Sequence, residues 1–206
     1  MFLSRTDAGI KLAQQLLLEK RSADIVLGLA RGGVEIAFNI SRRMEIPLDV
    51  LVVKKLGSPG NPELAIGAVA PDGMLYLDTH LARTTGAQEA YVKQDIKRLL
   101  PVIREKTALY RNGKGPLLLK NKTVILTDDG AATGATMFAA IRYIQRKGAR
   151  KIIAALPVAS PDIANKIRVM TAEVSVLESI SDFGAVGEFY KNFPQLTDED
   201  VVKLLT

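Results

Sequence analysis

The stretch from Val124 to Met137, VILTDDGAATGATM, constrains the fold of this chain more than any other part of the sequence. It begins with four residues, Val124 to Thr127, that form a short apolar run, as is typical of a strand buried on both faces of a parallel sheet. Two acids, Asp128 and Asp129, come directly after this run. They are therefore expected at the carboxyl end of the strand, the edge where open α/β sheets place their ligands.

A loop of small residues follows the two acids, and a helix is expected directly after it. All residues from Gly130 to Thr136 are small, and four apolar residues then recur at the spacing of one helix face: Met137, Ala140, Ile141 and Ile144. The first N–H groups of a helix have no partner within it, the helix dipole adds partial positive charge there, and small residues let an anion come close. The sequence therefore predicts a phosphate-binding loop.

The paired acids distinguish this loop from other phosphate-binding motifs. It has neither the Gly-x-x-x-x-Gly-Lys-[Ser/Thr] pattern of a P-loop nor the Gly-x-Gly-x-x-Gly pattern of a dinucleotide fold. The strand, the acids and the Thr-Gly-x-Thr run together resemble the phosphoribosyl-diphosphate (PRPP) motif of the type I phosphoribosyltransferases. This resemblance implies that Asp128 and Asp129 hold the ribose hydroxyls, and that the 5′-phosphate is bound by Ala132, Thr133, Gly134, Ala135 and Thr136. The alternative is an ordinary turn whose acids cap the helix.

Composition narrows the possible classes of protein but does not select one. The 206 residues, 48% hydrophobic and 24% charged, suffice for one sizeable core or one core with a small appendage. The chain has no cysteine, which excludes disulfides and thiolate chemistry. Its single histidine, His80, expected in a loop or on the surface, leaves little room for a zinc site or a Ser-His-Asp triad.

Charge and hydropathy add two expectations. The net charge of +6 indicates an anionic partner, which a phosphorylated small molecule supplies as well as nucleic acid does. No apolar run approaches the length of a membrane span, and the first residues lack the apolar segment of a signal peptide. We therefore expect a cytoplasmic protein with no membrane partner.

Two earlier segments complete the predicted site. Residues 24–29 read as a buried strand that leads into Ala30-Arg31-Gly32-Gly33 and then into a helix. The resemblance implies that Ala30, Arg31 and Gly32 form the pyrophosphate-binding turn, which in that family often contains a cis peptide bond. A glycine-rich turn without a ligand is the alternative. A second strand is predicted from Ile46 to Leu56. It ends in Lys54 and Lys55, which the resemblance makes candidate pyrophosphate contacts.

The segment after this strand is rich in glycine and proline. Residues 57–63 have the composition and length of a mobile lid, and the resemblance implies a flexible loop that closes over the substrate here. A long exposed hairpin connection is the alternative. Ala65 to Ala70 and Met74 to Asp78 then predict a two-stranded hairpin, joined at Pro71-Asp72-Gly73.

The remaining elements alternate between strand and helix. We expect a first helix from about Asp7, capped by that residue, to about Leu18, and a long helix from Thr84 to Arg111 that Pro101 kinks or divides. Its exposed basic face is interpreted as solvated rather than as a nucleic-acid footprint. The alternation predicts an α/β fold with a doubly wound, mainly parallel sheet and helices on both faces.

The last segment, residues 180–206, differs in composition from the rest. It carries Phe183, Phe189, Tyr190 and Phe193, and Thr197 to Asp200 predicts the cap of a final helix. In the resembled family a small hood of terminal segments covers the base, so Phe189 and Tyr190 are candidate base contacts. Packing of the tail onto the sheet is the alternative. We thus expect one phosphoribosyltransferase-like domain over residues 1–206, with 180–206 as the candidate hood.

The motif departs from the resembled pattern at two positions. Ala132 stands where members that use oxopurines carry an acid, which disfavours guanine or hypoxanthine as the acceptor. Gly130 replaces a branched apolar residue, which is expected to loosen the loop.

The resemblance implies a Mg²⁺-dependent phosphoribosyltransferase that moves the 5-phosphoribosyl group of PRPP to a nitrogenous base and releases pyrophosphate. The residues expected to act in catalysis are Asp128, Asp129, Lys54 and Lys55. The cofactor Mg²⁺ is expected to arrive with PRPP, without a preformed protein site. The expected partners are PRPP, a base and a second copy in a homodimer, and not nucleic acid. The alternative is a non-catalytic regulatory protein on the same fold that senses PRPP or a nucleotide and acts on nucleic acid.

Overall fold

The computed structural model describes residues 1–206 and contains eight strands, seven α-helices and two short 3₁₀ helices. In chain order these are α1 (Arg5–Leu18), β1 (Ile25–Leu29), α2 (Gly32–Met44), β2 (Leu48–Leu51), β3 (Lys54–Ser58), β4 (Asn61–Val69), η1 (Pro71–Gly73), β5 (Leu75–Leu77), α3 (Thr79–Thr84), α4 (Glu89–Arg111), β6 (Thr123–Thr127), α5 (Ala135–Arg146), β7 (Lys151–Ala159), α6 (Pro161–Met170), β8 (Glu173–Ser179), η2 (Val186–Phe189) and α7 (Asp198–Leu205).

The centre of the molecule is a five-stranded parallel sheet in the order β2-β1-β6-β7-β8. Its strand order reverses direction at β1, since β2 lies on one side of β1 and β6, β7 and β8 continue on the other. The turns after β1 and β6 therefore lie side by side at the carboxyl edge. In open α/β sheets this point is where ligands bind.

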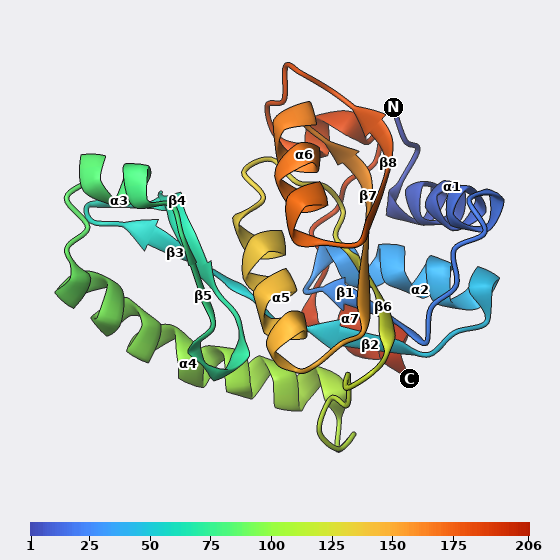
Figure 1. Ribbon diagram of the computed structural model, residues 1–206, viewed down its shortest axis with the longest axis horizontal. Coiled ribbons are helices and arrows are strands. Elements are labelled where there is room, and N and C mark those ends of the chain that lie inside the picture. Colours follow the sequence, from blue (N-terminus) through green and yellow to red (C-terminus); the bar gives the residue numbers. More distant parts are fainter.

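Alternate residues of the central strands serve two separate cores. Val26, Ile125 and Ile153 pack with α1 and α2 on one face of the sheet. Leu27, Leu126 and Ala154 pack with α5 and α6 on the other face (Figure 1). Because successive side chains of a strand point to opposite faces, a strand buried on both needs a continuous apolar run. The predicted doubly wound α/β fold is confirmed.

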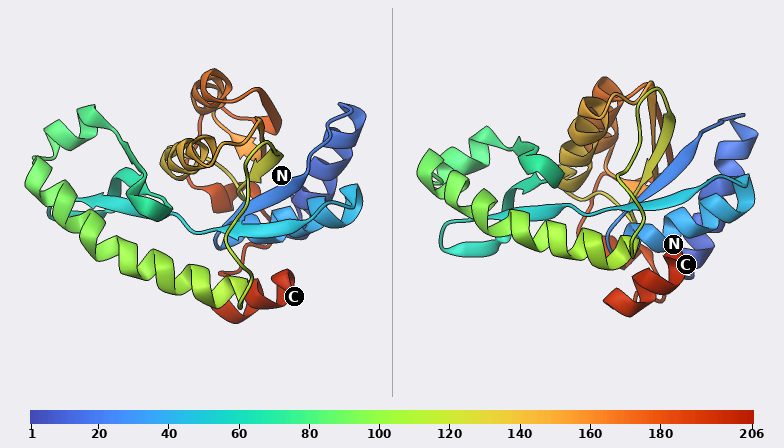
Figure 2. Two further views of the ribbon diagram at one scale, coloured as in Figure 1. Left: turned by 60° about the horizontal axis from the view of Figure 1, so that its bottom comes forward. Right: turned by 90° about the horizontal axis from the view of Figure 1, so that it is seen from below.

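A second, antiparallel sheet forms an arm beside this body, which we define as β3, β4, β5 and α3 (Figure 1). Helix α4 runs from the arm along the body and ends against α7, as the two views of Figure 2 show. Side chains of β3, β4, α4 and α7 share a third apolar core. The predicted hairpin after residue 64 is present as β4 and β5, joined at η1.

Three predicted elements differ from the structure. The strand expected from Ile46 to Leu56 is two strands, because the chain leaves the central sheet at Leu51 and enters the arm at Lys54. Helix α1 begins at Arg5, and its cap is Ser4, whose hydroxyl accepts the Asp7 N–H at 3.2 Å. Helix α4 is not divided at Pro101. The exposed position of Pro101 lets the helix tolerate the missing N–H there.

The segment predicted as a lid is the tip of a hairpin. Residues 57–63 span the end of β3, a tight turn and the start of β4, which corresponds to the alternative of an exposed hairpin connection. The ladder is irregular here, with register shifts on both sides of Gly57. Residues 60–64 are exposed.

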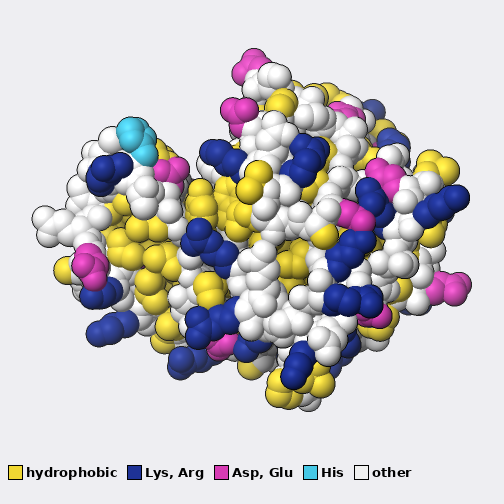
Figure 3. Space-filling model, in the orientation of Figure 1, with side chains coloured by type: hydrophobic (Ala, Val, Ile, Leu, Met, Phe, Trp, Pro, Cys, Tyr) yellow, Lys and Arg dark blue, Asp and Glu magenta, His cyan; other side chains and the backbone are white.

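The two terminal segments contact each other. The Phe2 N–H donates to the Phe189 carbonyl at 2.8 Å, and the Lys191 N–H donates to the Phe2 carbonyl at 2.8 Å. Helix α7 begins at the predicted cap, where the side chains of Thr197 and Asp200 form a reciprocal capping box. His80 lies exposed on α3, at the outer end of the arm (Figure 3). None of the helices combines the length and apolar character needed to cross a membrane.

Candidate active site

The turns that follow β1 and β6 open into one cavity of about 640 Å³ at the carboxyl edge of the sheet. Ala30, Arg31 and Gly32 line it from the first turn, and Lys54 and Lys55 line it from β3. The predicted residues that line it after β6 are Asp128, Asp129, Ala132, Thr133, Gly134 and Thr136. Of the residues predicted for PRPP, only Ala135, which is 5% exposed, does not line the cavity.

The loop before α5 carries a row of unpaired backbone donors. No N–H group from Ala132 to Thr136 donates a hydrogen bond within the chain. Gly134 occupies the N-cap position of α5 with a φ of 73°. A Cβ there would lie 2.8 Å from the Phe138 ring, so both the backbone angle and the packing require glycine. These free donors and the helix dipole make the loop suitable for an anion.

The two acids have different surroundings. Asp128 opens to the cavity on one side and is enclosed by protein elsewhere, and its Oδ1 accepts the Asp129 N–H at 2.9 Å. Burial raises the pKa of Asp128 well above its usual value, and the nearby charge of Asp129 raises this pKa further. Lys55 and Arg5 act in the opposite direction with smaller effects.

The turn after β1 packs directly against these acids. A Cβ on Gly32 would lie 1.9 Å from Asp129 Oδ2, and a Cβ on Gly33 would lie 2.8 Å from the Asp128 Cα. Glycine is therefore required at both positions for this close approach. The peptide bond between Ala30 and Arg31 is cis, as the sequence resemblance implies. The Arg31 guanidinium makes no hydrogen bond, and its nearest carboxylate oxygen belongs to Asp198, 3.9 Å away.

Comparison with known proteins identifies the family. The family described as "Phosphoribosyl transferase domain" matches residues 4–190, which is nearly the whole chain. The chain belongs to the phosphoribosyl transferase family. Two proteins of Mycobacterium tuberculosis, "Putative phosphoribosyl transferase MT0597" of strain CDC 1551 / Oshkosh and "Putative phosphoribosyl transferase Rv0571c" of strain H37Rv, are each 38% identical over 205 residues. These matches cover 100% of this chain and 46% of each relative, so the chain spans about half the length of these curated relatives.

Solved structures agree with this membership. The crystal structure of TT1426 from Thermus thermophilus is 40% identical, has a TM-score of 0.81, and is matched over 99% of this chain and 97% of its own. A purine phosphoribosyltransferase from Pyrococcus horikoshii Ot3 is 21% identical, with a TM-score of 0.50 and coverage of 94% and 93%. The second comparison supports the phosphoribosyltransferase fold alone.

Arg5 also contacts this candidate site, although the sequence did not predict it. The buried Arg5, 5% exposed, donates from Nε to Asp129 Oδ2 at 2.8 Å and from Nη1 to the Pro194 carbonyl at 2.7 Å. Its guanidinium carbon lies 3.6 Å from the centre of the Phe193 ring. Arg5 therefore occupies one face of Asp129 and ties it to both terminal segments. A lone arginine at the start of a helix gives no sequence signal for such a contact.

Lys54 and Lys55 enter the cavity without partners of their own. Both line it, and neither forms a side-chain hydrogen bond or an ion pair within the chain. Their position on β3 follows from the ladder between β3 and β4, in which Lys54 pairs with Val69. The arm therefore supplies unpaired positive charge to a cavity that β3, β4 and α3 of the arm line together with the turns of the body.

The predicted base contacts do not line the cavity. Tyr190 is 6% exposed, and its hydroxyl donates to the Asp129 carbonyl at 2.5 Å. Phe189 packs against Phe183, with ring centres 4.7 Å apart. Both rings pack within the tail, and neither lies where it could contact a base in the cavity.

Val186, unlike Phe189 and Tyr190, lines the cavity. Its position explains why residue 130 is a glycine. A Cβ on Gly130 would lie 2.8 Å from Val186 Cγ1 and 3.0 Å from Val158 Cγ1. The space of a branched residue at position 130 is thus already filled by Val186. The loop is packed rather than loosened at this glycine.

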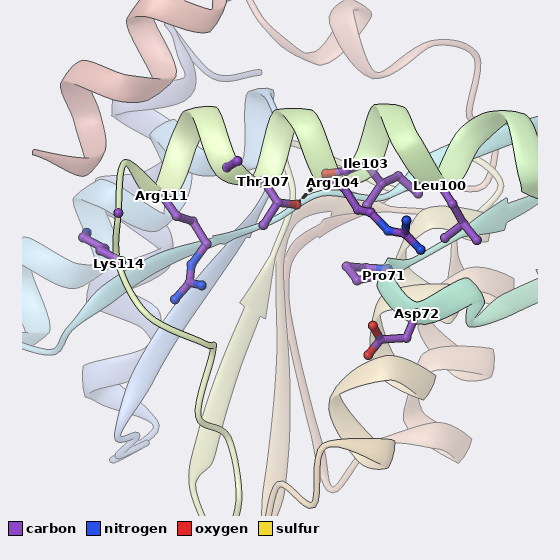
Figure 4. Close-up of a pocket in the computed structure, with 10 residues that line it drawn as sticks. Pro71, Asp72, Leu100, Ile103, Arg104, Thr107, Arg111 and Lys114 are labelled. Carbon is purple, nitrogen blue, oxygen red and sulfur yellow. Dashed lines mark hydrogen bonds between the residues drawn. The ribbon is translucent and has the colours of Figure 1, made fainter.

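A separate cavity of about 430 Å³ lies between η1 and the second half of α4 (Figure 4). Pro71 and Asp72 face Arg104 and Thr107 across it, and Arg111 extends from the last turn of the helix. Bonds from Arg111 to both Asp49 oxygens, at 2.9 Å each, hold that guanidinium in place. This cavity shares no lining residue with the active-site cavity and contains none of the predicted site residues.

Proposed function

We propose that this chain binds PRPP in the cavity of about 640 Å³ and transfers its 5-phosphoribosyl group to a nitrogenous base, with release of pyrophosphate. One observation carries this proposal. The free N–H groups of residues 132–136 and the two acids before them lie about a hundred positions from the turn at residues 30–32, yet all three groups belong to one cavity. These three groups suit the 5′-phosphate, the ribose hydroxyls and the pyrophosphate of PRPP, respectively.

Each part of PRPP has a complementary group. The 5′-phosphate lies at the start of α5, where the unpaired N–H groups and the helix dipole favour an anion. Asp128 and Asp129 accept hydrogen bonds from the ribose hydroxyls. The pyrophosphate lies at the turn, next to Arg31 and within reach of the unpaired Lys54 and Lys55.

The chemistry follows from holding both the sugar and its leaving group. The bond between ribose C1 and the pyrophosphate oxygen breaks, and its electron pair leaves with pyrophosphate. The bond between C1 and the base nitrogen forms, and the proton of that nitrogen passes to pyrophosphate or water. Positive charge develops on the sugar ring, which the neighbouring carboxylates stabilise. The chain needs no nucleophile of its own, and positioning together with exclusion of water supplies the rate enhancement.

A magnesium ion would enter with the substrate. No cluster of three or more acids, histidines or cysteines is present, and the carboxylates of Asp128 and Asp129 are oxygen donors of the kind Mg²⁺ accepts through water. The ion would supply neutralisation of the pyrophosphate charge. These residues therefore fit a magnesium carried by PRPP better than a resident one.

The acceptor would bind between the loop after β6 and the arm. Leu64, Leu81 and Val186 line the cavity with apolar surface, and no aromatic ring is among its lining residues. Ala132 provides no carboxylate for an oxopurine. These features support an acceptor held by apolar contacts and disfavour guanine and hypoxanthine.

Turnover separates this proposal from a sensor of PRPP on the same fold. A panel of nitrogenous bases is incubated with the chain, Mg²⁺ and PRPP, and release of pyrophosphate is measured. An enzyme releases pyrophosphate only when one of the bases is present, and a variant with Asp128→Asn and Asp129→Asn does not. PRPP binding without turnover on any base would favour the sensor. Assays of the full-length relatives are a useful parallel, because this chain corresponds to about half of their length.

A further inference from the structure

A smaller cavity of about 370 Å³ adjoins the active site on the far side of the turn after β1. It shares three lining residues with the larger cavity: Ala30, Arg31 and Lys54. Its other walls are Val52, Lys106 and Tyr110 from the body and α4, and Asp198 at the start of α7. Figure 2 shows α7 lying beside the last turns of α4.

The polar side chains of this cavity converge on a single carboxylate. Lys106 Nζ lies 2.5 Å from Asp198 Oδ2, and the Tyr110 hydroxyl donates to Asp198 Oδ1 at 2.5 Å. Arg31 Nη1 lies 3.9 Å from Asp198 Oδ1, too far for a hydrogen bond. The donors from Lys106 and Tyr110 lower the pKa of Asp198, which keeps it ionised at neutral pH. The Asp198 carboxylate is thus the anion that Lys106 and Tyr110 bind in this structure.

The charges lining the cavity do not balance. Arg31, Lys54 and Lys106 contribute three positive charges, and Asp198 is the one acid among the lining residues. Lys54 has no partner within the chain, and the Arg31 guanidinium keeps all its donors free. The cavity therefore retains positive charge after Asp198 is counted, and positive charge in a partly enclosed site attracts phosphate groups.

We propose that this cavity is a second anion subsite, in which Lys106 and Arg31 bind a phosphate group that extends past the turn at residues 30–32. The ligand class is a linear triphosphate, inorganic or on a nucleoside, with two phosphates on the side of the active site and the third beyond the turn. Asp198 competes with this phosphate for the same cations. The proposal rests on the function proposed above only in taking the turn as the pyrophosphate side of the active site.

Calorimetry with pyrophosphate and tripolyphosphate tests the subsite directly. The wild-type chain is expected to bind tripolyphosphate about tenfold more tightly, since one more phosphate meets two cations. Lys106→Ala should abolish most of this preference and leave the affinity for pyrophosphate unchanged. Lys97→Ala, which removes an exposed lysine from another face of the same helix, is the matched control and should keep the preference. A nucleoside triphosphate that binds more tightly than tripolyphosphate would identify the ligand as a nucleotide, and equal binding would identify the inorganic anion.

The Asp198→Asn variant tests the subsite independently. Asparagine keeps the size of the side chain and one acceptor oxygen and removes the competing charge, so tripolyphosphate should bind at least about threefold more tightly to this variant. Weaker binding to this variant, equal wild-type affinity for the two anions, or an equal loss of both anions in Lys106→Ala would each overturn the subsite. If Lys106→Ala does not fold, Lys106→Gln replaces it. Binding of Mg²⁺-PRPP, measured separately, reports on the proposed function and not on the subsite.

Discussion

Arg5 Nε lies 2.8 Å from Asp129 Oδ2, although the two residues are 124 positions apart in the sequence. The side chains of both are largely buried, 6% and 16% exposed. Arg5, the first residue of α1, thus holds a carboxylate that is proposed to bind the substrate. Because the same guanidinium contacts Pro194 and Phe193, segments near the start and the end of the chain both support the candidate active site.

Loss of this ion pair should destabilise the chain strongly. Arg5→Ala leaves the largely buried Asp129 carboxylate without its cation, which should cost about 3 to 5 kcal/mol of unfolding free energy. Lys11→Ala is the matched control, because its ion pair with Asp7 is on the surface of the same helix and contributes at most about 1 kcal/mol. Urea unfolding measures both. An Arg5→Ala loss no larger than that of the control would show that the pair is not structurally important.

The raised pKa of Asp128 predicts a specific dependence of stability on pH. In the unfolded chain this carboxyl titrates near its usual value of 3.8, whereas in the folded chain its pKa lies well above that value. At neutral pH the folded state therefore bears the cost of a buried charge, and this cost disappears as pH falls through the raised pKa. Asp128→Asn should be more stable than wild type at neutral pH, and the difference should shrink on acidification.

Denaturant unfolding of wild type and Asp128→Asn at several pH values between 5 and 8 measures this difference. A variant that is less stable than wild type by the same amount at every pH would contradict the burial of an unfavourable charge.

The packing of Gly130 against Val186 predicts a reciprocal effect. Gly130→Val places new methyl groups against Val186 and should cost about 1 to 3 kcal/mol through overpacking. Val186→Ala on the same background should recover most of that loss, since it vacates the space. Unfolding free energies of the two single variants and the double variant give the coupling. Additive effects would mean that the two positions do not compete for one volume.

Some parts of this site could be read from the sequence because they are local. The acids, the small-residue loop and the start of α5 lie within 14 consecutive residues, where strand, turn and helix preferences all agree. β1 and β6 are buried on both faces, and each therefore appears in the sequence as a continuous apolar run.

Other parts could not be read because they depend on tertiary contacts. The transfer of the chain from the central sheet to the arm near Val52 leaves no mark, since the apolar run from Val50 to Val53 continues through the break without a turn residue. Arg5 contacts Asp129 across 124 positions. Asp198 contacts Tyr110 across 88 positions. The tail aromatics fill the core around Tyr190, where their apolar character suits packing as well as a ligand.

The tip of the β3–β4 hairpin is predicted to respond to the substrate. Residues 60–64 are exposed, and Glu63 and Leu64 also line the active-site cavity. A protease that cuts after glutamate should cleave the free chain at Glu63, and Mg²⁺-PRPP should slow this cleavage several-fold by ordering the tip. Identification of the fragments by mass spectrometry locates the cut. Equal rates of cleavage at Glu63 with and without Mg²⁺-PRPP would leave this tip with a purely structural role.

Calorimetric titration of the chain with Mg²⁺-PRPP tests the central claim most directly. Binding should release or absorb heat at a stoichiometry of one per chain, and PRPP at 100 times its dissociation constant should add about 3 kcal/mol to the unfolding free energy. Replacing both Asp128 and Asp129 by asparagine should weaken this binding, and the titration is made where circular dichroism shows that the variant is folded, because Asp129→Asn also removes the charged partner of Arg5. Absence of binding heat for the wild-type chain, or an affinity unchanged in the double variant, would contradict a PRPP site at the carboxyl edge of β6.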